Sequence, residues 1–345
     1  KESDFHGIRV LHVPQKKFKN TGLRLLGFVY WHVISFLIAL FLKNIDVILS
    51  PSPPLTIGMV NLWLAKMKKC KVIYNIQEIY PDILHKDEGV IVSLLRKMEH
   101  CVYNHSSAVT TIDQVFYNTI EPRFENKSKL HIIPNFVDTQ LYSPSVGSVN
   151  ELDIKLFPHT DSLKLLYAGN IGFAQDWETL VLLSQRSIRD NIEYFVIGEG
   201  VMKSFLEQKK IEYGLEKLHI IPYQSRSLMP SILAYSDIQY IFMDPKMDME
   251  GFPSKVYTIM ACAKPLLVCS GKKTPIINFL DDKDCAKLIT TSDSTQKVEE
   301  MYQWLKSVQK EQLVQLGKNG MTCIHKTYSK EVVTKQYVDL VDSIL

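Results

Sequence analysis

Apolar and polar positions follow two periods along the chain, and the two periods alternate. Short apolar runs bounded by Gly, Pro, Asn or Asp are typical of buried strands, and apolar residues three or four apart are typical of helices. The predicted strands are 8–13, 46–49, 72–75, 108–112, 131–134, 163–168, 194–198, 219–222, 238–243 and 266–269. The predicted helices are 56–67, 93–105, 115–120, 229–234, 256–263, 275–280, 294–309 and 329–345. This strand–helix order predicts the α/β class with parallel sheets.

One apolar segment is ambiguous in function. Residues 27–42 are sixteen residues without a charge. A membrane-spanning helix needs about twenty, so the sequence favours a helix buried in the first domain. The alternative is a helix at the bilayer interface, with the neighbouring cations meeting anionic lipid. Those cations are Lys16, Lys17, Lys19, Arg24 and Lys43.

The length of 345 residues predicts two domains of ordinary size. Residues 144–159 are rich in Ser and Pro and contain Gly, which is typical of a linker. We therefore predict a first domain over 1–150, a second over 151–328 and a final helix over 329–345.

Composition and charge narrow the class of protein. Apolar content of 46% and charged content of 22% indicate a folded globular protein. The six cysteines form no Cys-x-x-Cys pair, which favours reduced thiols in a cytosolic enzyme over disulfides or a metal site. The net charge of +3 divides into +8 over residues 1–71 and −5 over the rest. A basic end indicates an anionic partner, and without a nucleic-acid-binding pattern we expect a membrane surface rather than nucleic acid.

Two glycine-containing turns follow predicted strands of the second domain. Gly169 and Gly172 allow the backbone to approach a ligand closely, and Asn170 between them offers a donor and an acceptor. A plain turn is the alternative. The second turn, at 198–200, is not a dinucleotide fingerprint because Lys203 replaces the third glycine.

Two acids, Glu78 and Asp82, follow the predicted strand 72–75. Open α/β sheets bind their ligands at the carboxyl ends of strands. The pair is therefore a candidate for polar recognition or acid–base chemistry, and an ordinary capping loop is the alternative.

The segment 250–269 has the strongest local pattern. Gly251 and Pro253 precede Ser254, a good N-cap residue, and the spacing predicts a helix of about three turns that Pro265 ends. Lys255 falls in the first turn, where its charge opposes the helix dipole. Local stability does not explain a lysine there, whereas an anion bound at the helix start would. A solvated lysine is the alternative.

The sequence from Glu250 to Pro265 resembles the donor-binding helix of family 4 (GT4) glycosyltransferases, particularly the bacterial capsule and O-antigen sugar transferases with a Pro-Ser-Lys motif. Residues 166–180, 77–82 and 133–138 resemble further elements of that family. The resemblance implies the GT-B fold: two Rossmann-like, doubly wound domains facing a cleft, with a C-terminal helix that crosses back to the first domain. It also implies that an initial strand–loop–helix segment is absent from this sequence.

The resemblance implies specific roles. Glu250, Glu78 and Asp82 are the implied catalytic residues. The implied donor-binding residues are Gly169, Asn170, Gly172, Glu199, Tyr223, Pro253, Ser254, Lys255 and Thr258. Thr258 replaces the second glutamate of the family. Asn170 and Gln175 replace an arginine and a lysine, which leaves more of the phosphate charge to Lys255.

The implied reaction is retaining transfer of a hexosyl or deoxy/aminodeoxy sugar, without a bound metal or other cofactor. A UDP- or GDP-sugar is the expected donor, and a polyprenyl-diphosphate-linked saccharide is the expected acceptor. The implied process is synthesis of bacterial surface polysaccharide, and the expected location is the cytoplasm, peripheral on the inner face of the plasma membrane. A nucleotide-sugar epimerase on the same fold and a non-catalytic assembly protein are the alternatives.

Overall fold

The structure is a computed structural model, and it describes residues 1–14, 18, 20–82, 89–248 and 252–345. It divides into two compact units, one of Lys1–Pro134 with Lys335–Leu345 and one of Asn135–Thr334. Residues 135–150, expected in the first domain, lie in the second unit. Hydrogen bonds hold them there: Val137 N–H donates to Tyr328 O (3.0 Å), and Ser148 N–H donates to Ser231 Oγ (3.2 Å).

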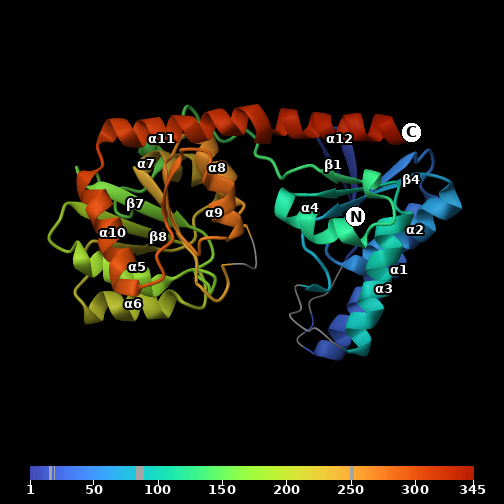
Figure 1. Cartoon of the computed structure of the whole chain (residues 1–345), viewed down its shortest axis with the longest axis horizontal. Coiled ribbons are helices and arrows are strands. Elements are labelled where there is room, and N and C mark those ends of the chain that lie inside the picture. The colour runs from blue at the N-terminus through green and yellow to red at the C-terminus, as the bar shows by residue number, and fades with distance from the viewer. Residues whose placement is uncertain (15–17, 19, 83–88, 249–251) are drawn as a thin grey trace. The chain divides into compact units, whose positions relative to one another are not determined.

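The first unit contains one parallel sheet in the order β3-β4-β5-β6. Tyr74 and Ile76 of β4 pack with Val102 and Tyr103 of α3 in its buried core. The elements, in chain order, are β1 (Glu2–Phe5), β2 (Ile8–Leu11), α1 (Thr21–Phe41), β3 (Val47–Pro51), α2 (Leu55–Lys68), β4 (Lys71–Ile76), α3 (Val90–His105), β5 (Ala108–Thr111), α4 (Gln114–Ile120) and β6 (Leu130–Ile132). The helix α12 (Lys330–Ile344) spans the division between the units, because its residues from Lys335 onward belong to the first (Figure 1).

The predicted strand 8–13 is not part of that sheet. β2 pairs antiparallel with β1 in a separate two-stranded sheet. His6 and Gly7 between the strands both have positive φ, as a tight hairpin turn requires. The turn that directly precedes β2 in the chain therefore decides that β2 pairs with β1.

The expectation that residues 27–42 form a buried helix is wrong. Residues 27–41 belong to α1, and His32 is the only buried residue of this helix, held between Phe28 O (2.9 Å) and Thr56 Oγ1 (3.0 Å). By length and composition α1 could cross a membrane, and only 6% of its most apolar window is buried. A broad apolar face of α1 is therefore exposed.

The second unit has a six-stranded parallel sheet in the order β12-β11-β10-β7-β8-β9, which is doubly wound as expected. Its elements are β7 (Leu163–Ala168), α5 (Trp177–Arg186), β8 (Ile192–Ile197), α6 (Lys203–Glu212), β9 (Leu218–Ile221), α7 (Met229–Tyr235), β10 (Ile238–Phe242), α8 (Lys255–Ala261), β11 (Leu266–Cys269), α9 (Pro275–Leu280), β12 (Ala286–Ile289), α10 (Ser294–Ser307) and α11 (Lys310–Cys323). The α/β class and the parallel sheets are confirmed.

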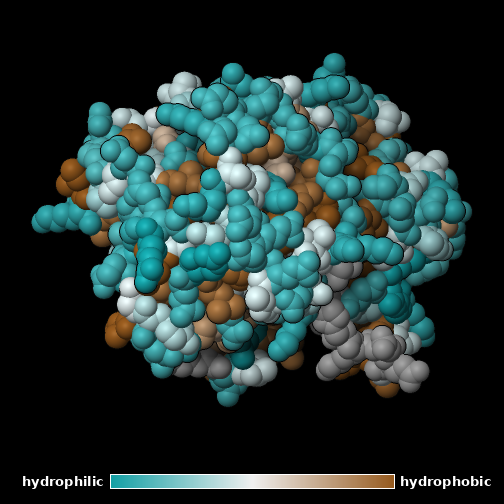
Figure 2. Space-filling view, turned by 60° about the vertical axis from the view of Figure 1, so that its left-hand side comes forward, coloured by the Kyte–Doolittle hydropathy of each residue, from teal (hydrophilic) through white to brown (hydrophobic). Residues whose placement is uncertain are grey.

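Alternate residues of each central strand enter different cores of this unit. Tyr194 and Val196 of β8 pack in one core with α5 and α6, and Phe195 and Ile197 pack in the core on the other face. Figure 1 shows α5, α6 and α10 on one side of the sheet and α7, α8 and α9 on the other. Burial on both faces explains why the strands read as continuous apolar runs. On the face seen in Figure 2, hydrophobic residues form small groups among hydrophilic ones.

Candidate functional site

The carboxyl ends of β7, β8 and β9 in the second unit border a pocket of about 410 Å³. The loops that follow these strands supply most of its wall, and the segment that leads into α7 supplies the rest. The lining residues are Ala168, Gly169, Asn170, Ile197, Gly198, Glu199, Tyr223, Gln224, Arg226 and Met229. A pocket at this edge matches the general position of ligand sites in open parallel sheets.

Glycine is required where the first two loops meet. Gly169 N–H donates to Ile197 O (2.9 Å), and Gly198 N–H donates to Ile221 O (3.0 Å), so each loop is tied to the next strand. Gly198 has φ +147°, and a Cβ there would lie 1.9 Å from Gly169 O. The backbone of both loops is therefore closely packed behind the pocket.

Lys255 reaches this edge from the first residue of α8. Its Nζ donates to Ala168 O (3.0 Å) and lies 3.6 Å from the centre of the Tyr167 ring. A Cβ on Gly169 would lie 2.6 Å from the same Nζ, so a larger residue would displace the amine. The amine of Lys255 therefore lies directly behind Ala168 and Gly169, which are two residues of the pocket wall.

The charge of Lys255 is poorly compensated. Burial lowers its pKa from the usual value for lysine to about 7. Within the described ranges, its amine has no carboxylate partner; the recorded contacts are a carbonyl oxygen and an aromatic ring. An anion in the pocket would favour the charged form of Lys255.

Two further predicted residues line the pocket and differ in character. Glu199 is exposed and pairs with Lys203 (2.9 Å), and this hydrogen bond lowers its pKa. Tyr223 is 70% exposed, so one face of its ring is available for stacking.

The sequence reasoning missed Arg226, a cation in the lining of the pocket. It is exposed and follows Tyr223 by three residues in the loop after β9. That loop was already predicted to contact a ligand, so its only Arg could have been singled out.

Four described residues that were predicted to bind the donor do not line the pocket. Gly172 O accepts a hydrogen bond from Trp177 Nε1 (2.7 Å), which supports the loop. Ser254 is the N-cap of α8 but makes no side-chain capping bond. Pro253 O accepts from Val256 N–H (3.0 Å), and Thr258 O accepts from Cys262 N–H (3.2 Å). Glu250 lies outside the described residues.

The helix that begins at Lys255 is shorter than predicted. It has seven residues instead of about three turns. The chain leaves the helix at Ala263, which has φ +51°, before Pro265 is reached. A left-handed residue ends a helix locally, and apolar spacing does not reveal it.

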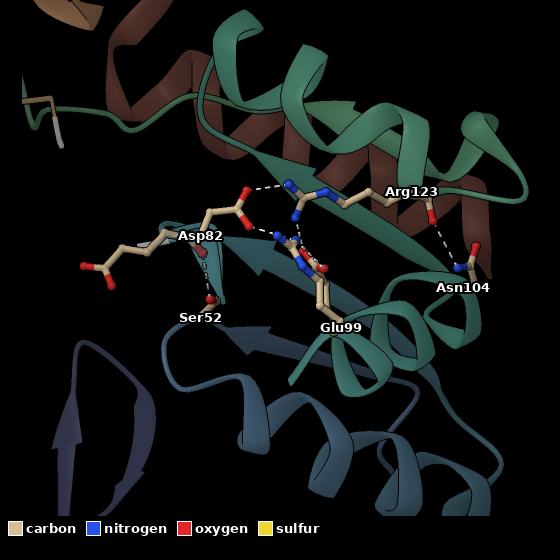
Figure 3. A network of polar contacts seen from close by, with 7 residues as sticks. Ser52, Asp82, Glu99, Asn104 and Arg123 are labelled. Atoms are coloured by element: carbon tan, nitrogen blue, oxygen red, sulfur yellow. Dashed lines mark hydrogen bonds and ion pairs between the residues drawn. The ribbon is translucent and has the colours of Figure 1, made fainter. Parts of the chain in front are cut away.

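In the first unit, Asp82 belongs to a network of ion pairs (Figure 3). Its carboxylate lies 2.8 Å from Arg96 Nη1 and 2.5 Å from Arg123 Nη2. Both arginines also contact Glu99, which is buried and whose pKa burial raises. Because both oxygens of Asp82 face guanidinium groups, its surroundings are those of a structural ion pair.

Glu78 differs from Asp82. It is half-buried, and among the described residues its carboxylate has no hydrogen-bond or ion-pair partner. Its carbonyl oxygen accepts a hydrogen bond from Ser52 Oγ (3.5 Å), which holds the loop. Of the two predicted acids of this unit, Glu78 is therefore the one whose carboxylate is open to a ligand.

The fold and the pocket define an α/β protein that can hold an anionic ligand at the strand ends of its second unit. The chain belongs to the glycosyl transferases group 1 family, whose model matches residues 149–322.

Two known relatives are more specific in name. The chain is 23% identical over 261 residues to WcaI of Escherichia coli K12, named as a colanic acid biosynthesis glycosyl transferase. It is 21% identical over 243 residues to WbjE of Pseudomonas aeruginosa, named as a glycosyltransferase. The matches cover 73% and 69% of this chain and span 64% and 60% of the lengths of these relatives.

Among solved structures, the GT-B protein Alr3699/HepE of Anabaena in complex with UDP matches with a TM-score of 0.72 at 14% identity. The match covers 92% of this chain and 84% of HepE. The similarity confirms the GT-B class of fold.

Proposed function

We propose that the protein is a glycosyltransferase that moves a sugar from a nucleotide-sugar donor to an acceptor hydroxyl. The observation that carries this proposal is the pocket at the strand ends with Lys255 behind its wall, whose amine has no carboxylate partner among the described residues. Family membership supports the reaction class, and the HepE complexes with UDP and UDP-glucose support the class of donor.

The donor diphosphate is proposed to lie at the loop that begins at Gly169. A departing nucleoside diphosphate gains negative charge, so fixed positive charge near it stabilises the transition state. Lys255 and Arg226 are the cations that this edge of the sheet provides, and Asn170 adds an amide donor. We place the base of the donor at Tyr223 and expect uracil or guanine.

The acids take different proposed roles. Glu250 holds hydroxyl groups of the donor sugar, as the resemblance to the Pro-Ser-Lys subgroup implies. Glu78 acts on the donor sugar or the acceptor from the first unit. Asp82 positions the loop of Glu78 through its arginine partners. The transfer proceeds with retention and uses no metal.

The acceptor is proposed to be a polyprenyl-diphosphate-linked saccharide, in a pathway to capsule or O-antigen. The name of WcaI, which refers to colanic acid biosynthesis, supports this type of product. We propose that the protein lies at the cytoplasmic face of the plasma membrane, where the exposed α1 and the basic residues 1–71 contact anionic lipid.

The proposal is tested by thermal denaturation with UDP-, GDP-, ADP- and dTDP-sugars. A ligand that binds only the folded state raises the midpoint according to RT ln(1 + [L]/Kd). We expect a rise with the sugars of one base, lost in Lys255→Ala and kept in the control Lys246→Ala, which removes an exposed cation outside the pocket lining. No rise with any donor, on folded protein, would reject this donor site.

A further inference from the structure

We propose that the first unit contains a second ligand site, for an alkyl chain that ends in a phosphate group. The site is a pocket of about 440 Å³ between α2, α3 and the starts of β4 and β5. This volume lies in the usual range of small-molecule sites. The pocket is independent of the proposed glycosyl transfer, because it involves none of the residues assigned to the donor or to catalysis.

The pocket lies at the amino-terminal edge of the sheet. Val72, the second residue of β4, lines it, and so does Ser107, which directly precedes β5. Glu78 follows the opposite, carboxyl end of β4. The length of β4 therefore separates this pocket from Glu78 and from Asp82.

One face of α2 makes the apolar wall. Met59, Leu62 and Trp63 are spaced by three and four residues, so their side chains lie on the same face. Trp63 is 62% exposed. Val72 adds a further apolar surface, and together these side chains suit an alkyl chain.

Basic side chains follow the apolar residues along the same part of the pocket wall. Lys66 follows Trp63 by one turn, Lys69 caps the helix, and His105 of α3 adds a third basic side chain. Neither lysine has an ion pair or side-chain hydrogen bond to a residue that the structure describes. None of the lining residues in the described ranges is an Asp or Glu. This charge distribution favours an anion.

Lys68, which lies between Lys66 and Lys69 in the sequence, differs from both because its amine is hydrogen-bonded within the protein. Its Nζ donates to Leu40 O (2.9 Å) and to Leu42 O, so it serves the carboxyl end of α1. Lys66 and Lys69 have no such structural task in the described chain. Their ammonium groups are available for a phosphate, while the apolar wall beside them takes the chain.

Two cysteine thiols in the pocket lining allow ligand binding to be measured by the rate of their alkylation. Cys70 and Cys101 both line the pocket, and Cys101 Sγ lies 3.8 Å from His105 Nδ1. Both cysteines are free and half-buried. A bound ligand would therefore slow the alkylation of Cys101.

The test measures the rate of alkylation of Cys101 by N-ethylmaleimide, with mass spectrometry to separate the six cysteines. The probes are n-octyl phosphate below its critical micelle concentration, n-octanol and inorganic phosphate. We expect octyl phosphate to slow alkylation at least fivefold, and each of the other two to have little effect, because binding needs both the chain and the charge.

The variants are Lys66→Gln/Lys69→Gln and the control Lys318→Gln/Lys326→Gln, which removes two exposed lysines of the second unit. We expect the first pair to weaken octyl phosphate binding about tenfold and the second to leave it unchanged. Equal protection by octanol, or equal binding by both variants, overturns the proposal. In that case the lysines serve only the carbonyl end of α2, and their loss lowers the thermal midpoint alone.

A vesicle arm identifies the source of the ligand. Protection of Cys101 by phosphatidylglycerol vesicles but not by phosphatidylcholine vesicles assigns a bilayer lipid. Protection by octyl phosphate alone assigns a soluble alkyl phosphate. A UDP-sugar is included as a probe and should leave Cys101 unprotected, so that failure here and failure of the donor site are read separately.

Discussion

Lys255 lies between a carbonyl oxygen and the face of Tyr167, where its charge is costly. An unfolded lysine has a pKa of about 10.4, whereas burial lowers that of Lys255 to about 7. Between these pH values the folded state binds fewer protons than the unfolded state. The free energy of unfolding therefore rises with pH across this window, and the stabilisation is lost as pH falls toward 7.

Urea denaturation at pH 7.5, 8.5 and 9.5 measures this effect. One proton contributes at most about 1.4 kcal/mol per pH unit. The slope should be smaller in Lys255→Met, which keeps most of the length of the side chain and removes the charge. Equal slopes in the two proteins would show that Lys255 is charged throughout.

Gly198 is the second residue with a sharp prediction. Its replacement by Ala places a Cβ 1.9 Å from Gly169 O, at a φ of +147°. We expect Gly198→Ala to lower the free energy of unfolding by roughly 3 kcal/mol or more. The control is Gly214→Ala, at φ +60° with no atom within 4 Å of the new Cβ, for which about 1 kcal/mol is expected. Urea denaturation measures both losses. Similar losses of unfolding free energy in the two variants would show that the loops at Gly169 and Gly198 move apart at little cost.

At the scale of elements, the ion-pair network joins the segment after β4 to α3 and to the segment after α4. Arg123 contacts both Asp82 and the buried Glu99, and its side chain is 22% exposed. Arg123→Met leaves Glu99 without its main partner and should cost roughly 3–5 kcal/mol. Arg96 is 46% exposed, and Arg96→Met should cost about 1 kcal/mol or less. The comparison is made by urea denaturation, and equal costs would contradict it.

Substitutions of Asp82 and Glu78 should have different effects on stability and on activity. Asp82→Asn weakens the contacts to two guanidinium groups, so we expect a loss of about 1–3 kcal/mol in stability. Glu78→Gln removes a carboxylate with no described partner, so stability should change by less than about 0.5 kcal/mol. If Glu78 acts in the reaction, its loss should lower sugar transfer at least tenfold. Thermal denaturation and a transfer assay distinguish the cases, and full activity of Glu78→Gln would remove it from the site.

At the scale of the molecule, an apolar helix and an uneven charge occur in the same part of the chain. The exposed face of α1 includes Leu26 at 65% and Val29 at 51%, within a segment of net charge +8. We expect the protein to bind vesicles of phosphatidylglycerol, and more weakly as salt rises. Leu26→Glu/Val29→Glu should reduce vesicle binding roughly tenfold or more.

The control for that experiment is Ile211→Glu, at a side chain of α6 that is 83% exposed in the second unit. Co-sedimentation with vesicles measures the bound fraction, and gel filtration measures the oligomeric state. A dimer that depends on Leu26 and Val29, without vesicle binding, would assign the face of α1 to a second copy of the chain.

Much of the fold was predictable from the sequence, because strand and helix signals are local. The strand 163–168 was predicted with the observed bounds, and α3 and α12 within a few residues. The parallel α/β class follows from the strand–helix order, and the doubly wound second unit is what the family resemblance implied. For the candidate site, the sequence indicated Gly169 because glycine allows close backbone approach, and Lys255 because its charge opposes the helix dipole.

Only the tertiary structure decided which partners those elements and side chains have. α1 was expected to be buried and is exposed, because an apolar run does not specify what covers it. Asp82 looked like a catalytic acid until Arg96 and Arg123 were placed around it. Arg226 lines the pocket because the loop after β9 lies beside the loop after β8. Local order depends on neighbours in the chain, whereas burial, charge pairing and ligand sites depend on contacts between residues far apart in it.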